Sequence, residues 1–153
     1  MNIPMKHWRI GEILIQKKWI DWKQLEEALN EQKKTSEPVG EVLVRKQHIP
    51  KFLLFKALAE RHAMPFVDLF HVFIDPHTVE RVPKSVAVKY GFMPIEIQDG
   101  AMVVGIGDPR AVLPGSEIAA MAKVSGIKTV LCTPDAVTVA IDQNYGGGTG
   151  VSA

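Results

Sequence analysis

The sequence has 153 residues, which is enough to bury a core without disulfides or a metal. Its 18 Lys and Arg residues face 17 Asp and Glu residues, and the formal net charge of +1 excludes a bulk field that would attract nucleic acid or an anionic membrane. A single cysteine, Cys132, excludes an internal disulfide and is expected to be a small buried residue. Neither a signal peptide nor a membrane-spanning apolar stretch is seen, so we expect a cytoplasmic protein without direct membrane insertion.

An internal repeat occupies the first part of the chain. Residues 9–32 read RIGEILIQKKWIDWKQLEEALNEQ, and residues 38–61 read PVGEVLVRKQHIPKFLLFKALAER. Similar residues recur at one offset, 40 − 11 = 29 for the first glycines and 58 − 29 = 29 for the last leucines. The three-and-four spacing of the apolar positions predicts a short helix, a turn and a longer helix in each copy, joined by a spacer at 33–37. Four helices are therefore expected within residues 5–64.

Capping signals mark where the two long helices begin. Asp21 is followed three residues later by Gln24, which predicts a capping box at the first of them. Pro50 is suited to the first turn of the second, and the apolar residues after it, Phe52 among them, are expected to supply buried surface.

From residue 65 the pattern becomes that of a small mixed α/β subdomain, extending to residue 145. Asp99-Gly100 between two β-rich segments is a strong hairpin signal. The predicted elements are an extended segment at 66–69, turns or helices opening at 75 and 83, strands at 92–98, 101–105 and 127–132, and helices at 116–124 and 134–145. The fold class is thus α+β, with a repeated four-helix subdomain before the α/β part, and a flexible Gly-rich tail at 146–153.

Signatures of catalysis and of metal binding are missing from the sequence. The glycines at 100 and 105 have the spacing of a phosphate loop, but Ile106 stands where that loop needs Lys. Arg110 takes the place of the third glycine of a dinucleotide fingerprint. The five histidines show no ligand-like pairing, and no Ser or Cys lies in a nucleophile elbow. We therefore predict a binding protein with no catalytic residue, no metal and no cofactor.

The duplicated pattern resembles the N-terminal domain of type II secretion and type IV pilus assembly ATPases, and most closely its cyclic di-GMP-binding form, the MshEN domain. The matching features are Arg-Ile-Gly at 9–11, leucines and Ala-Leu at fixed distances, Gln32, Pro-Phe-Val-Asp-Leu at 65–69 and Gly-Asp-Pro at 107–109. The resemblance implies a cyclic di-GMP-binding regulatory module that signals to a secretion or pilus assembly ATPase or to an inner-membrane platform protein. The alternative is a protein–protein docking domain of such a system that no longer binds the dinucleotide.

By this resemblance the dinucleotide contacts both repeats. Arg9 would stack on guanine or bond its O6 and N7, Gln32 would meet a base edge, and Asp108 would accept from the guanine N1–H and N2–H groups. The glycines would let phosphates approach the backbone. The implied ligand-binding residues are Arg9, Ile10, Gly11, Leu14, Leu25, Leu29, Gln32, Val39, Gly40, Glu41, Leu43, Leu54, Leu58, Arg61 and Asp108.

Structural interpretations of the same residues stay open. Any pair of amphipathic helices needs the leucines for its core, the two glycines also permit close helix packing, and Arg9 also suits a solvated surface. The second repeat departs from the first, because Pro38 stands in place of Arg9 and Arg61 in place of Gln32. Lys18 and Gln47 replace a glycine at the turn between the helices, where we expect strain or altered turn geometry.

Overall fold

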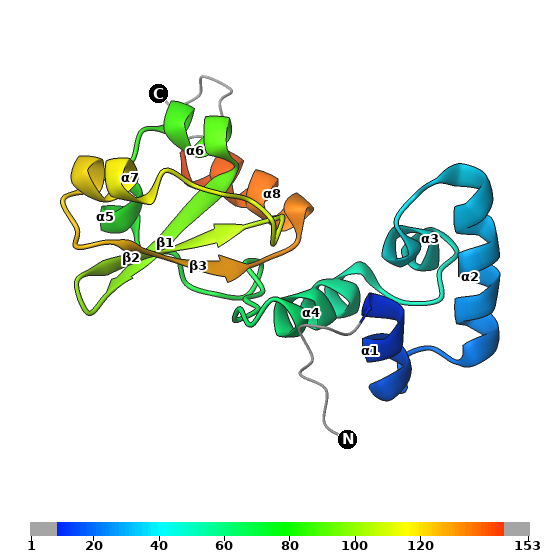
Figure 1. Cartoon of the computed structure of the whole chain (residues 1–153). Coiled ribbons are helices and arrows are strands. Elements are labelled where there is room, and N and C mark those ends of the chain that lie inside the picture. Colours follow the sequence, from blue (N-terminus) through cyan, green and yellow to red (C-terminus); the bar gives the residue numbers. More distant parts are fainter. Residues whose placement is uncertain (1–8, 146–153) are drawn as a thin grey trace. The chain divides into compact units, whose positions relative to one another are not determined.

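The computed structural model describes residues 9–145 (Figure 1). The predicted Gly-rich tail at 146–153 lies outside these residues, and so does the start of the helical subdomain expected from residue 5. The chain divides into two compact units, Met1–Met64 and Pro65–Ala153, which are taken in turn below. Within the described residues there are eight helices and a three-stranded mixed sheet, so the predicted α+β class is confirmed.

The first unit consists of two helix pairs, as the repeat predicts. Its helices are α1 (Ile10–Gln16), α2 (Trp22–Thr35), α3 (Val39–Arg45) and α4 (Lys51–Arg61). The spacer expected at 33–37 is shorter, because α2 continues to Thr35 and ends at Ser36, whose φ is 62°. Short helix α1 packs on α4, and α3 packs on α2, so each short helix contacts the long helix of the other repeat.

The core of this unit uses equivalent positions of the two repeats. Its buried members are Ile13, Leu14, Ile20, Leu25 and Ala28 from the first repeat, and Val42, Leu43, Ile49, Leu54 and Ala57 from the second. The equivalent lysines of the two repeats form ion pairs beside it: Lys17 Nζ lies 2.6 Å from Glu60 Oε1, and Lys46 Nζ lies 3.1 Å from Glu27 Oε1. The hydrogen bond from Lys46 lowers the pKa of the Glu27 carboxyl below its ordinary value. Polar links therefore also join one repeat to the other.

The starts of the long helices follow their capping residues. The Gln24 N–H donates to Asp21 Oδ1 at 2.8 Å, and the Asp21 N–H donates to Gln24 Oε1 at 3.0 Å, which confirms the predicted capping box. Pro50 precedes α4 as its N-cap instead of lying in its first turn. Phe52 is 53% exposed, so the expectation that it is buried was wrong.

The turns inside the two repeats have the same geometry although neither contains glycine. Lys18 has φ 62° and Gln47 has φ 63°, the left-handed conformation in which glycine is favoured. The Lys18 N–H donates to the Ile15 carbonyl at 2.9 Å and the Trp19 N–H to the Leu14 carbonyl at 3.1 Å, the two bonds of a Schellman motif. The strain that was expected at these turns is therefore present in both repeats, because a side chain occupies the left-handed conformation at Lys18 and at Gln47.

The second unit is a three-stranded sheet with four helices (Figure 1). In chain order its elements are α5 (Pro76–Val79), α6 (Lys84–Tyr90), β1 (Phe92–Gln98), β2 (Ala101–Ile106), α7 (Gly115–Ala122), β3 (Ile127–Leu131) and α8 (Pro134–Asn144). The strand order is β1-β2-β3. Strands β1 and β2 form an antiparallel hairpin, and α7 provides the crossover that makes β3 parallel to β2.

Local signals located most of these elements within one or two residues. Asp99 and Gly100 have φ of 52° and 82°, as a two-residue hairpin with the right-handed strand twist requires. The extended segment at 66–69 is confirmed at Phe66, which pairs in parallel with Leu131 beside β3. Cys132 is fully buried, as expected, and burial raises the pKa of its thiol to about 12.

Candidate functional site

Arg9 stands at the head of α1 with its side chain exposed. It is the N-cap residue, with φ −75° and ψ 152°, and its N–H donates to Glu12 Oε1 at 2.8 Å. The guanidinium makes no hydrogen bond or ion pair with the other residues that the structure describes. The backbone of Arg9 is therefore tied to Glu12, whereas its guanidinium is left unpaired by the described residues and can meet an anion or a flat base.

The glycines of the two repeats serve helix packing. A Cβ at Gly11 would lie 2.8 Å from Leu25 Cδ1, and a Cβ at Gly40 would lie 2.8 Å from Leu54 Cδ1. Both glycines are buried in helices. The repeated glycine thus lets each short helix approach a leucine of its own long helix, which supports the packing interpretation at these two positions.

The predicted leucines divide into core and surface positions. Leu14 and Leu43 are fully buried, and Leu25 and Leu54 are nearly so. Leu29 is 40% exposed and Leu58 is partly buried. Leu29 and Leu58 therefore expose the larger side-chain surface, whereas the other four leucines pack in the core, and Leu25 also borders the groove described below.

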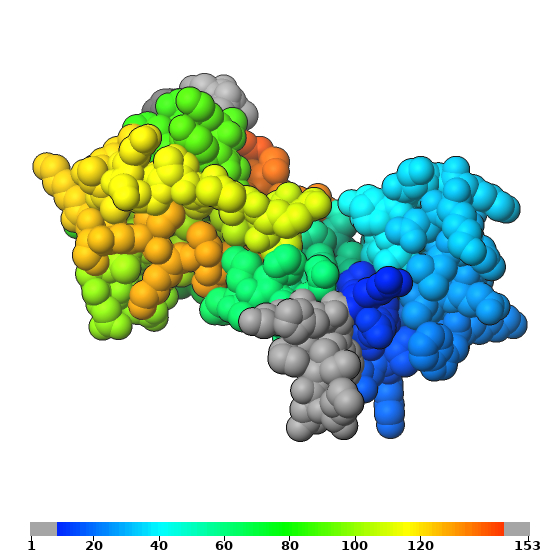
Figure 2. Space-filling model, in the orientation of Figure 1, coloured from blue at the N-terminus to red at the C-terminus, as the bar shows by residue number. Residues whose placement is uncertain are grey.

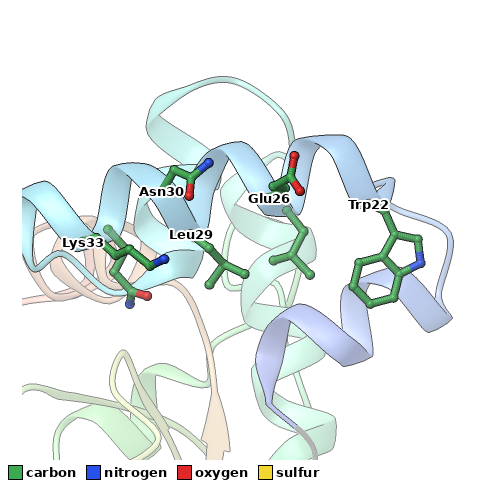
Figure 3. Close-up of a pocket in the computed structure, with 7 residues that line it drawn as sticks. Trp22, Glu26, Leu29, Asn30 and Lys33 are labelled. Carbon is green, nitrogen blue, oxygen red and sulfur yellow. The ribbon is translucent and has the colours of Figure 1, made fainter.

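A shallow groove of about 470 Å³ follows one face of α2 (Figure 3). It contains three predicted residues and four that were not predicted. The lining consists of Trp22, Leu25, Glu26, Leu29, Asn30, Gln32 and Lys33. The α2 region is sky blue in the space-filling view (Figure 2).

Two ridges of side chains enclose this groove. Trp22, Glu26 and Asn30 follow one another at four-residue spacing, and Leu25, Leu29 and Lys33 do the same beside them. The repeated leucines predict only Leu25 and Leu29 of the second ridge. Extending the spacing back by one turn, from Leu29 through Leu25 to Trp22, is the signal that leads to the indole.

The predicted residues of the second repeat lie on α3 and α4. Pro38 is the exposed N-cap of α3, and Glu41 is exposed in its first turn. Val39 and Arg61 are half-buried, as is Ile10 of the first repeat. The backbone of Pro38, with φ −57° and ψ 141°, closely matches that of Arg9, so the two repeats differ here in side chain and not in conformation.

Asp108 belongs to the second unit, just after β2. Its Oδ1 accepts from the Arg110 N–H at 2.8 Å and lies 3.4 Å from Arg110 Nε. Before it, a Cβ at Gly107 would lie 2.8 Å from Pro134 Cα, so this position requires glycine. The exposed carboxylate shapes the turn, and a guanine bound to it would compete with the Arg110 side chain.

Other kinds of site find no support within residues 9–145. No group of three or more His, Cys, Asp or Glu residues there could hold a metal ion. Within the same range no helix combines the length and apolar character needed to cross a membrane.

Comparison with known proteins identifies a family to which the sequence is similar. The MshEN domain family matches residues 62–151, more than half of the chain. This chain belongs to the MshEN domain family. The matched range contains Asp108, whereas the other predicted ligand residues, from Arg9 to Arg61, lie before it.

Relatives in two bacteria are type IV pilus assembly ATPases. PilB of Thermus thermophilus is 41% identical over 106 residues, which are 69% of this chain and 12% of that protein. PilB of Myxococcus xanthus is 26% identical over 137 residues, which are 90% of this chain and 24% of that protein. The chain therefore spans no more than about a quarter of the length of these relatives.

Solved structures share the fold. A structure of MshE with cdg superposes with a TM-score of 0.71 at 22% identity and covers 91% of this chain and 100% of that one. The N-terminal domain of XpsE superposes with a TM-score of 0.55 at 15% identity and covers 94% and 98%. The similarity is thus to the N-terminal domain of XpsE and to a part of the pilus assembly ATPases that makes up 12–24% of their length.

Proposed function

We propose that this chain binds cyclic di-GMP through its first repeat and reports the bound state to a pilus or secretion motor. The observation that carries the proposal is the likeness of the fold to MshE, which was solved with cdg, the same dinucleotide. Membership of the MshEN family and the relationship to pilus assembly ATPases support the same assignment.

The first repeat offers the chemistry that a guanine nucleotide requires. The exposed guanidinium of Arg9 can stack on a base or form two hydrogen bonds to O6 and N7. Leu29 adds exposed apolar surface on α2, and the Gln32 amide both donates and accepts at a base edge. In the second repeat Pro38 supplies no cation, and Arg61 donates but cannot accept. The proposed site is thus stronger on the side of the first repeat.

The signalling part of the proposal concerns a partner. We propose that the module acts in the cytoplasm on a secretion or pilus assembly ATPase, or on an inner-membrane platform protein, and that the chain itself turns over no nucleotide. The competing function is docking without a dinucleotide. One observation favours it: Phe70 and Phe73 of the segment before α5 are 58% and 78% exposed, which is unusual for large apolar side chains without a partner.

Calorimetric titration tests the two functions against each other. Cyclic di-GMP is added to the chain, with GTP and cyclic di-AMP as controls. Saturable binding of cyclic di-GMP alone supports the sensor. Binding of none of the three contradicts it and leaves the docking function. Intact nucleotides after incubation, checked by chromatography, are expected, and turnover of any of them would contradict a purely regulatory role.

A further inference from the structure

Trp22 is a large aromatic side chain that the fold leaves uncovered. It is the first residue of α2 and is 68% exposed. Its indole borders the groove along α2 (Figure 3) and also a second groove of about 430 Å³, which Trp19 and Lys18 help to line. Tryptophan usually stabilises a protein by being buried in its core. An exposed tryptophan does not do so, and its presence at this position needs another explanation.

Neither capping nor the core explains the indole. The N-terminus of α2 is capped by Asp21 and Gln24, whose reciprocal hydrogen bonds involve no side chain of Trp22. The helix is anchored by Leu25 and Ala28, which are buried in the core of the first unit. Trp22 is not among the residues of that core or packed against it. A smaller residue at this position would preserve the described contacts of the helix.

We infer that Trp22 is a stacking surface for a guanine of the bound dinucleotide. This inference rests on the proposed function and adds a residue to its site. Trp22 and Leu29 are two turns apart on one face of α2, about 10 Å along its axis, and Gln32 follows about 5 Å farther on. Stacking on an indole uses the flat face of the base and leaves its polar edge free to meet amides or charged groups in the same groove.

The other groups of the groove favour a base over a helix of a partner protein. A docking helix would place apolar residues against both ridges. The ridge that begins with Trp22 continues with Glu26 and Asn30, which are polar and exposed. A carboxylate one turn from the indole can instead accept from the N–H groups at the edge of guanine, and Lys33 brings a positive charge toward phosphate. The groove therefore combines an aromatic plane with polar groups, as a nucleotide requires.

Two aromatic residues give a matched pair of variants for the test. Trp22→Leu removes the aromatic plane at the start of α2, and Phe52→Leu removes an exposed ring from the start of α4, outside the groove. Calorimetry with cyclic di-GMP is expected to show affinity about 10-fold weaker for Trp22→Leu, equivalent to about 1.4 kcal/mol, within the range for stacking of one base. Phe52→Leu should bind within about twofold of the unchanged chain, and Trp22→Phe should retain most of the affinity.

Fluorescence gives a second readout that does not depend on the folding of Trp22→Leu. The chain has three tryptophans, Trp8, Trp19 and Trp22, so Trp8→Phe combined with Trp19→Phe leaves Trp22 as the reporter. Cyclic di-GMP is expected to quench its emission along the calorimetric binding curve. Undiminished affinity of Trp22→Leu together with unquenched emission would overturn the inference while leaving the proposed function intact. Failure of the unchanged chain to bind cyclic di-GMP would overturn both.

Discussion

The hydroxyl of Tyr145 donates a 2.9 Å hydrogen bond to the carbonyl oxygen of Val82. The bond joins the residue after α8 to the segment before α6, 63 residues earlier in the chain. Burial raises the pKa of this phenol from 10.0 to about 12. The C-terminal helix of the second unit is therefore held at its end by a group that must stay neutral.

Tyr145→Phe is expected to lower the free energy of unfolding by about 0.5–1.5 kcal/mol near neutral pH, because one partly buried hydrogen bond is lost. The pH dependence follows from the raised pKa. Below pH 10 the phenol is neutral in both states, and between pH 10 and 12 it ionises first in the unfolded state, so the stability of the unchanged chain falls as pH rises. Denaturant unfolding should show the two proteins converging across this window. If the difference in the free energy of unfolding between the two proteins stays constant with pH, the raised pKa of Tyr145 is contradicted. Tyr90→Phe serves as the control at neutral pH.

Gly11→Ala tests the close approach of α1 to Leu25. The new methyl would lie 2.8 Å from Leu25 Cδ1, so the buried leucine must move, at a cost that exceeds the gain in helix propensity of about 1 kcal/mol. We expect a net loss of about 1 kcal/mol in denaturant unfolding. Gly115→Ala is the control, since its methyl would meet Ile127 at an ordinary 3.5 Å and should be neutral or stabilising. If Leu25 is the residue that clashes, Gly11→Ala should lower the free energy of unfolding by less in a Leu25→Ala background than in the unchanged chain.

Lys18→Gly should stabilise the first unit. The lysine has φ 62°, and relief of this left-handed conformation is expected to gain about 0.5–1 kcal/mol. Gln47→Gly should do the same in the second repeat, where φ is 63°. Lys23→Gly is the control, because Lys23 is an exposed residue within α2. This exchange should lower the free energy of unfolding by about 1 kcal/mol. Thermal unfolding of the three variants gives the comparison, and destabilisation by Lys18→Gly would show that this side chain matters more than its backbone.

Local chemistry explains how much of the fold was predictable. The hairpin at Asp99-Gly100 and the capping box at Asp21 depend on neighbouring residues, and both were predicted correctly. Exposure depends on what packs against a residue from elsewhere in the chain, which periodicity does not show. Phe52 and Leu29 fit the apolar face of their helices in the sequence, yet 53% and 40% of them are exposed.

The candidate site shows the same division. Duplication identified the two repeats, but it could not separate the buried Leu25 from the exposed Leu29, because both recur with the motif. Trp22 was missed because it has no counterpart in the second repeat, where Lys51 stands at the equivalent position. A feature that only one copy carries escapes a search for what both copies share.

Arg9→Ala tests the proposed guanidinium contact. Affinity for cyclic di-GMP is expected to fall by about 1–3 kcal/mol, the range for a well-formed contact with guanine. The exposed side chain makes no ion pair with the described residues, so the helical content should be unchanged by circular dichroism. Lys23→Ala, an exposed cation on α2 outside the groove, controls for the loss of one charge. Equal affinity of folded Arg9→Ala and the unchanged chain would remove Arg9 from the site.

Pro38→Arg tests whether the second repeat lacks only its leading guanidinium. Pro38 caps α3 with nearly the backbone conformation of Arg9, so arginine fits there without strain. The exchange restores an N–H that Glu41 can accept, as Glu12 accepts the Arg9 N–H at 2.8 Å, and this offsets the greater chain entropy of the unfolded state, about 0.4–1 kcal/mol. Stability should therefore change little, while affinity for cyclic di-GMP should rise about tenfold, as one added guanidinium contact provides.

The matched control for this gain is Pro50→Arg. Pro50 is likewise exposed and is the N-cap of α4, with φ −66° and ψ 147°, but it belongs to neither the repeat heads nor the groove. Pro50→Arg adds the same charge and removes the same proline ring as Pro38→Arg. A general attraction of the dianionic ligand would therefore raise affinity equally in both variants. A gain confined to Pro38→Arg shows a specific contact at the head of the second repeat. If Pro38→Arg is as stable as the unchanged chain and binds no more tightly, the second guanine is held by another group, and Arg61→Ala becomes the variant that identifies it.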